Sequence, residues 1–363
     1  MYEAWFEYRA REIRQGGNPW PTVDHVFASG NSPYQIYATL LAQALGAPAP
    51  YSARWVSAVN GLLGVAVTGL LVGACLRAEW PDERPALAAL TASTLLAALF
   101  AGLLYSRDGT QNAAGLLWTA IVMFGLYQTL ATRRPAWAAA RWAAFTGAAL
   151  AVALTTYEAA LILPAVVLAY AAARAPALGW RPVARVTLLI GLTALALSAP
   201  LLVYYTRHPD VVLNRLRATA PSAAGGPTLT SVLAGLGRVA GGLFISGDQL
   251  FGQNLSGRPL FDPFGAGLLG LGLAAALRRW RGSAAAPLLI IAAALQALPA
   301  AVTANAPAFS RMLPMLPALL GLAGWGAATA WGWARSRGRA ARGGVGGAET
   351  AGRWHTGAPR GER

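Results

Sequence analysis

The chain has 363 residues, of which 56% are hydrophobic and 12% are charged, and 29 arginines against 14 acids give it a net charge of +15. A soluble domain carries about 25% charged residues, so this composition excludes an ordinary soluble globular protein. Most of the arginines separate long apolar runs, which indicates a multi-spanning membrane protein and not a nucleic-acid-binding one.

Two short helices are predicted before the first long apolar run. Residues 3–15 suit a helix that ends at a Gly-Gly pair, and Glu7 and Arg11, one turn apart, are expected to stabilise it slightly. Residues 33–46 suit a second helix, with Pro33 in the first turn, where proline is well tolerated.

Long apolar runs dominate the rest of the sequence. A membrane span needs about 20 mostly apolar residues. Nine spans are predicted, at about 54–76, 85–105, 112–131, 137–156, 158–174, 184–205, 262–278, 284–303 and 312–333. The expected fold class is therefore an all-α integral membrane protein.

One further run, residues 228–245, has a single charge, Arg238. Its apolar residues at helical spacing form one stripe, made by Val232, Leu236, Val239 and Leu243. We interpret it as a helix lying at the outer membrane interface. The alternative is a tenth span, which would move the arginines that follow residue 277 to the outer side.

Arginines in short connections mark the cytoplasmic side of a membrane protein. If the sides alternate from residues 1–53 onward, eleven arginines fall in the short connections of one side and only Arg107 and Arg311 in those of the other. The eleven are Arg77, Arg84, Arg133, Arg134, Arg141, Arg174, Arg181, Arg185, Arg278, Arg279 and Arg281. We therefore expect a multi-pass protein of the cell (inner) membrane with these arginines and the C-terminal tail in the cytoplasm.

The predicted organisation has five parts. They are extracytoplasmic first-loop helices (1–53), a six-span bundle (54–205), an extracytoplasmic loop with the interfacial helix (206–261), a three-span bundle (262–333) and a basic, disordered cytoplasmic tail (334–363).

Three acids at the outer face are candidate catalytic residues, because carboxylates at the edge of a membrane are costly. Glu158 lies between two apolar runs, and the alternative is that it only marks a tight outer turn. Glu3 opens the first outer helix, where it could simply favour the helix dipole. Asp108 follows Arg107, and a local turn with a surface ion pair is the alternative there.

Outer-face arginines are candidate ligands for a phosphate. Arg107, Arg258 and Arg311 are the candidates, with binding of a lipid headgroup as the non-catalytic alternative for Arg258 and Arg311. The single cysteine, Cys75, and three scattered histidines predict neither a disulfide framework nor a metal site. The sequence leaves open whether a divalent cation takes part.

Five stretches in order resemble a known family. They are Glu-Ala-Trp-Phe-Glu-Tyr-Arg-Ala-Arg-Glu-Ile (3–13), Gly-Asn-Ser-Pro-Tyr-Gln-Ile-Tyr with Ala-Arg-Trp-Val-Ser-Ala (30–37 and 53–58), Leu-Tyr-Ser-Arg-Asp-Gly (104–109), Thr-Thr-Tyr-Glu-Ala-Ala-Leu-Ile-Leu-Pro (155–164) and the loop over 247–263. Together they resemble bacterial members of glycosyltransferase family 39, which are similar to dolichyl-phosphate-mannose protein mannosyltransferases and aminoarabinose transferases and have the GT-C fold. The resemblance covers about residues 2–330.

This resemblance implies a membrane glycosyltransferase. Such enzymes take a sugar from a polyprenyl-phosphate donor and transfer it, on the outer face, to a lipid, glycan or protein acceptor. By analogy, a carboxylate of the first outer loop would act as general base, and a cation near the membrane surface would stabilise the leaving phosphate. Membrane lipids are further expected partners, and nucleic acid is not.

The sequence departs from the family at three places. Tyr2 stands where the family often has an Asp before the Glu, and Asn112 stands where many members have an Asp. Relatives also have a span before the first of these segments, so this chain is expected to lack its first span. A catalytically inactive paralogue and a transporter or flippase-like protein are therefore the alternative functions, although no internal repeat favours the latter.

Overall fold

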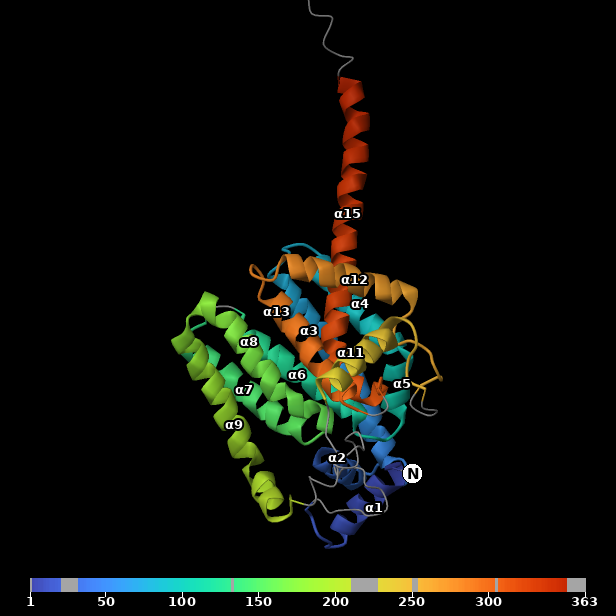
Figure 1. Cartoon of the computed structure of the whole chain (residues 1–363), viewed down its shortest axis with the longest axis vertical. Coiled ribbons are helices and arrows are strands. Elements are labelled where there is room, and N and C mark those ends of the chain that lie inside the picture. The colour runs from blue at the N-terminus through green and yellow to red at the C-terminus, as the bar shows by residue number, and fades with distance from the viewer. Residues whose placement is uncertain are drawn as a thin grey trace, which may run out of the picture.

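A computed structural model describes residues 2–20, 32–131, 134–209, 228–249, 254–303 and 306–350, with the side chains of those between residues 4 and 337. Most of these residues are helical, and none of them forms a β-strand (Figure 1). The helices are α1 (Tyr2–Arg14), α2 (Pro33–Ala44), α3 (Ser52–Arg77), α4 (Arg84–Ala98), α5 (Phe100–Arg107), α6 (Asn112–Leu130), α7 (Ala136–Leu154), η1 (Glu158–Ile162), α8 (Leu163–Leu178), α9 (Trp180–Arg207), α11 (Leu229–Phe244), α12 (Pro263–Arg278), α13 (Ala285–Ala301), α14 (Phe309–Met312), η2 (Leu313–Met315) and α15 (Leu316–Thr350).

All nine predicted spans are helical. Within the described residues, six helical segments are long and apolar enough to cross a membrane, and α4 with α5 make a seventh if this bent pair counts as one span. The remaining two, predicted at 262–278 and 284–303, form α12 and α13, which are apolar but have 16 and 17 residues. The prediction of an all-α multi-pass membrane protein is confirmed.

The span predicted over 85–105 is broken. Its two halves, α4 and α5, meet at an angle of 61°, and Leu99 between them has extended backbone angles. A β-carbon on Gly102 would lie 2.7 Å from the carbonyl oxygen of Leu96, so the backbones approach too closely for a side chain there. The bend turns α5 away from the path of α4 and leaves space beside it.

Glycines also allow α12 to cross directly over α15 (Figure 1). A β-carbon on Gly272 would lie 1.7 Å from the carbonyl oxygen of Leu322, and one on Gly326 would lie 2.0 Å from that of Leu268. Small residues let helices in membranes approach to backbone contact, where packing replaces the missing hydrophobic driving force. This crossing fixes α12 on the last span.

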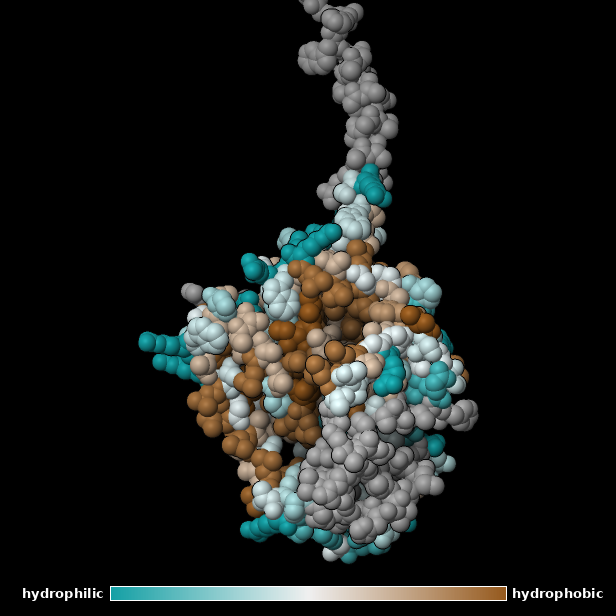
Figure 2. All heavy atoms as spheres, viewed as in Figure 1, coloured by the Kyte–Doolittle hydropathy of each residue, from teal (hydrophilic) through white to brown (hydrophobic). Residues whose placement is uncertain are grey.

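The bundle has two distinct ends. Figure 1 shows α1 and α2 at one end, and the connections α3–α4, α8–α9 and α12–α13 at the end from which α15 projects. In these connections or within a few residues of them lie seven of the predicted cytoplasmic arginines: Arg77, Arg84, Arg174, Arg181, Arg278, Arg279 and Arg281. The surface between the ends is largely apolar, as Figure 2 shows, with exposed side chains such as Leu188, Leu192 and Leu195 of α9.

Glu7 fastens α1 to the start of the first long helix. Its buried carboxylate accepts hydrogen bonds from the backbone N–H of Ala53 at 2.7 Å, the hydroxyl of Ser52 at 2.6 Å and the amide of Gln43 at 2.8 Å. It thereby satisfies one of the backbone amides that have no partner within the first turn of α3. Glu7 was expected to pair with Arg11 within α1. Its carboxylate instead bonds Gln43, Ser52 and Ala53 outside that helix.

The stripe of α11 that includes Val239 packs against α13, where a β-carbon on Gly235 would lie 2.0 Å from the carbonyl oxygen of Ala301. The interfacial position of this helix stays a prediction.

One segment differs from expectation. Helix α15 continues to Thr350, past residue 334, where a disordered tail is predicted. The Ala- and Arg-rich residues that follow the span favour helix, and the start of this segment is anchored because Arg335 forms an ion pair with Glu83. Residues 351–363 lie outside the described part.

Candidate functional site

Glu158 and Arg311 face each other at the end of the bundle that holds α2. Glu158 begins η1, between α7 and α8, and its carboxylate lies 3.7 Å from the guanidinium of Arg311 in α14. The side chains are 20% and 14% exposed, so the pair is mostly enclosed but reachable. Helix α2 lies beside this pair. The backbone N–H of Tyr34, in α2, donates to the carbonyl oxygen of Thr155 at 3.3 Å, three residues before Glu158. The structure thus brings two predicted site residues together.

A chain of hydroxyl groups continues from this pair into the bundle. Ser310, next to Arg311, accepts a hydrogen bond from the hydroxyl of Tyr157 at 3.4 Å and is also hydrogen-bonded to Tyr105 of α5. Both tyrosines are buried. The broken span, the η1 turn and α14 therefore meet in one polar cluster.

Two aspartates flank the cluster. Asp108 and Asp248 both lie near enough to Tyr105 to act on its hydroxyl electrostatically. Asp108 caps the end of α5 and accepts a hydrogen bond from the hydroxyl of Thr110 at 3.2 Å. Asp248 is 2% exposed and accepts the backbone N–H of Phe309 at 3.0 Å, which fixes the start of the short helix that carries Arg311. Asp248 is thus a positioning residue.

An apolar cavity of about 310 Å³ adjoins the cluster, in the space that the bend opens. Its walls come from α3, the α4–α5 break, α6 and η2, and include Leu62, Leu96 and Leu313. Tyr105 lines the cavity as well as belonging to the hydroxyl cluster, and the predicted phosphate ligand Arg107 lies at its edge, exposed. An apolar space with a guanidinium at its edge suits a lipid that carries a phosphate.

The remaining predicted site residues lie apart from the pair or outside the described side chains. Arg258 is exposed, and its guanidinium lies 5.9 Å from the centre of the Phe100 ring, at the opposite end of α5 from Arg107. The backbone of Glu3 belongs to the first turn of α1, and its side chain lies outside the described part. Phe100, beside which Arg258 lies, and Arg107 are about 10 Å apart along the axis of α5.

Several buried polar groups near α2 and α6 had no partner or role predicted from the sequence. Tyr34 donates its hydroxyl proton to the side-chain oxygen of Asn60 at 2.8 Å and packs edge-on against Trp118. The amide nitrogen of Asn60 and the indole nitrogen of Trp118 are buried without a hydrogen-bond partner among the described residues. Asn112, noted as a departure from the family, is likewise buried with its side-chain oxygen unpaired within that part. Polar residues inside apolar runs were the available signal.

Among the residues that the structure describes, no three His, Cys, Asp or Glu side chains lie close enough together to hold a metal ion.

We expect Asp248→Ala to lower the free energy of unfolding by about 1–3 kcal/mol, because the buried N–H of Phe309 loses its acceptor. Thermal unfolding of the purified protein in detergent measures this. Asp262→Asn is the matched control: Asp262 caps α12 by accepting the N–H of Gly265 at 2.7 Å, and Asn caps helices equally well. Equal stability of wild type and the Asp248 variant would contradict the positioning role.

Solved structures share this architecture. The crystal structure of ArnT from Cupriavidus metallidurans bound to undecaprenyl phosphate superposes with a TM-score of 0.65 and 20% sequence identity, over 89% of this chain and 55% of that one. Its apo state gives 0.63 and 19%, over 89% and 54%. The chain thus spans about half the length of these structures. The predicted GT-C-like membrane fold is confirmed. No protein-family model and no curated protein matches the sequence.

Proposed function

We propose that the protein is a membrane glycosyltransferase that moves a sugar from a polyprenyl-phosphate donor to an acceptor on the extracytoplasmic face. The observation that carries the proposal is the position of Tyr105. It lines an apolar cavity on one side and joins, through Ser310, the cluster beside Glu158 and Arg311 on the other. A lipid-binding space and a polar reaction site are therefore contiguous.

The cavity is suited to the donor. Its apolar walls would take isoprene units near the phosphate, while the longer part of the chain stays in the bilayer. Arg107 at its edge and Arg311, which follows the Ser310 that bonds Tyr105, would contact the phosphate. Arg258 is a third cation, near the Phe100 end of α5. The bound lipid in the ArnT crystal structure, undecaprenyl phosphate, is of this chemical class.

The reaction needs a base and a stabilised leaving group. A carboxylate takes the proton from the acceptor hydroxyl, the oxygen attacks the anomeric carbon, and the bond from that carbon to the phosphate oxygen breaks with its electron pair. We assign the base to Glu3 of α1 or to Asp108, which lies near Tyr105. Arginines offset the charge that grows on the departing polyprenyl phosphate, and Glu158 holds Arg311 for this task.

The test is an assay of the purified protein with a panel of polyprenyl-phosphate sugars. We expect at least one donor to release polyprenyl phosphate, with the sugar appearing on an added lipid, glycan or protein acceptor. A variant with both Glu158→Gln and Arg311→Gln controls for contaminating transferases, and it should show neither product. Absence of release and transfer with every donor would overturn the proposal.

A further inference from the structure

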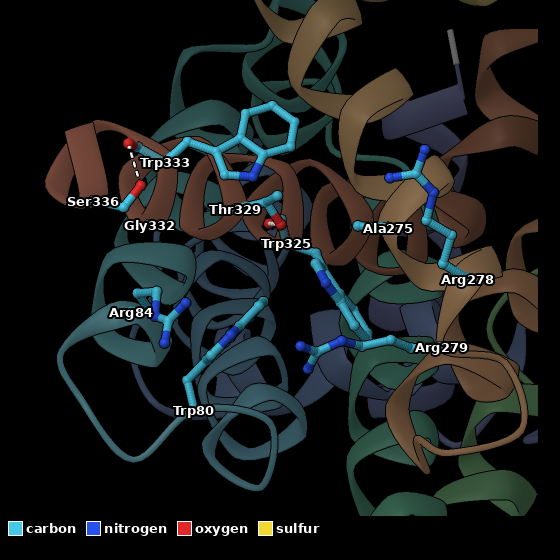
Figure 3. Close-up of a pocket in the computed structure, with 10 residues that line it drawn as sticks. All are labelled: Trp80, Arg84, Ala275, Arg278, Arg279, Trp325, Thr329, Gly332, Trp333 and Ser336. Carbon is cyan, nitrogen blue, oxygen red and sulfur yellow. Dashed lines mark hydrogen bonds between the residues drawn. The ribbon is translucent and has the colours of Figure 1, made fainter. Parts of the chain in front are cut away.

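A second pocket, drawn in Figure 3, is lined by elements of the bundle end from which α15 projects (Figure 1), opposite the cluster described above. It has a volume of about 430 Å³ and opens between the α3–α4 connection, the end of α12 and one face of α15. Its lining is rich in arginine and tryptophan: Trp80, Arg84, Arg278, Arg279, Trp325 and Trp333. The proposed sugar transfer uses none of these residues.

The pocket wall is built from stacked rings and guanidinium groups. Arg84 and Arg279 lie over the Trp80 ring at 5.0 and 5.6 Å from its centre. Trp80 in turn packs edge-on against Trp325, with ring centres 5.8 Å apart. Such ring contacts hold the guanidinium groups in place and leave some of their N–H groups free to donate to a ligand.

The charge of the lining is positive. Arg84 pairs with Asp82 at 2.9 Å and Arg279 with Glu79 at 3.1 Å. Arg278, across the pocket in Figure 3, has no ion pair within the described part of the chain. Three guanidinium groups against two carboxylates leave one positive charge.

A donor in the wall lacks a partner. The indole N–H of the fully buried Trp325 has no hydrogen-bond partner among the described residues. A buried donor is normally paired. An anion in the pocket would be attracted by the guanidinium of Arg278 and, at longer range, by the dipole of the enclosed Trp325 indole.

The position of the pocket along the helices indicates the source of the anion. Helix α3 ends at Arg77, α4 begins at Arg84 and α12 ends at Arg278, so the pocket lies where the apolar segments end. Trp333, half exposed, lies at the same level. Arginine and tryptophan at this level are typical of the headgroup region of a bilayer. We propose that this pocket binds the headgroup phosphate of an anionic membrane phospholipid.

Native mass spectrometry of the detergent-solubilised protein with added phosphatidylglycerol tests the proposal. We expect Arg278→Gln to weaken binding of the first lipid about fivefold or more, because a charge-assisted contact is lost. Trp333→Ser, which changes no charge, should also weaken it. The control is Arg281→Gln, which removes an exposed arginine at the same end of the bundle but outside the pocket; it should bind like wild type.

Two results would overturn the proposal. Equal weakening by Arg278→Gln and Arg281→Gln would mean that the lipid responds only to the overall charge of this end. Displacement of the lipid by glycerol phosphate or inorganic phosphate at similar concentrations would mean that the pocket takes a soluble anion. Monodisperse elution and unchanged thermal unfolding of each variant show that it is folded before its binding is compared.

Discussion

Replacing Glu158 by glutamine should lower the rate of sugar transfer by about a hundredfold or more. The variant keeps the size and polarity of the side chain but removes the charge that faces Arg311 at 3.7 Å. The guanidinium would then lose its fixed position beside the cluster that contains Ser310 and Tyr157. Because the charge on the leaving phosphate grows only toward the transition state, we expect kcat to fall more than KM rises.

A double-mutant cycle separates this role from a structural one. Arg311→Gln should cost about as much as Glu158→Gln, and the double variant little more, since two residues that act as a unit are not additive. The matched control is Glu83→Gln, which breaks a Glu–Arg pair with Arg335 at the other end of the bundle and should leave transfer unchanged. Fully additive losses would show that Glu158 and Arg311 act separately.

The second large effect concerns the crossing of α12 over α15. Gly272→Ala should destabilise the protein by about 3 kcal/mol or more and leave little folded material after extraction, because overpacking is costly where neither backbone can move aside. The added carbon would lie 1.7 Å from the carbonyl oxygen of Leu322. Yield of monodisperse protein and its thermal unfolding measure this.

Another glycine of the same helix provides the control. A β-carbon on Gly270 would meet nothing within 4 Å, so Gly270→Ala should be neutral or stabilise α12 by up to about 1 kcal/mol through its helix propensity. A Gly272→Ala variant that unfolds like the Gly270→Ala variant would refute the close approach of the two helices.

The spans could be predicted because a bilayer imposes a length and an apolar composition on every helix that crosses it. The break at Leu99 could not, since the run around it is uniformly apolar and Leu99 itself is a good helix former. The signal is Gly102, which a sequence alone does not distinguish from the other glycines of the spans. The limits predicted for α12 and α13 agree with the observed ones to within two residues, because their ends are marked by charged or turn-forming residues.

For the candidate site, the sequence identified residues but not their partners. Glu158 and Arg311 were both predicted, yet they come from distant segments, and only the packing of η1 against the end of α13 and α14 brings them together. Glu7 is the reverse case. The spacing of Glu7 and Arg11 predicts a contact within their own helix, whereas in the structure the Glu7 carboxylate accepts hydrogen bonds from Ser52 and Ala53. A buried carboxylate that accepts from the N–H at the start of another helix is a tertiary contact, and the spacing of charges within one helix does not reveal it.

The bend between α4 and α5 has a consequence for water. A break in a helix frees backbone N–H and C=O groups from their partners, and at membrane depth such groups must bond to protein or to water that fills a cavity. Before a donor binds, the cavity beside Leu96 and Gly102 would admit that water. Isoprene units would displace the water from the apolar part of the cavity, and a hydrated notch would remain at the end near Arg107. A charged phosphate could descend into such a notch without losing its whole hydration shell, so the bend lowers the desolvation cost of bringing a lipid-linked sugar below the headgroup plane.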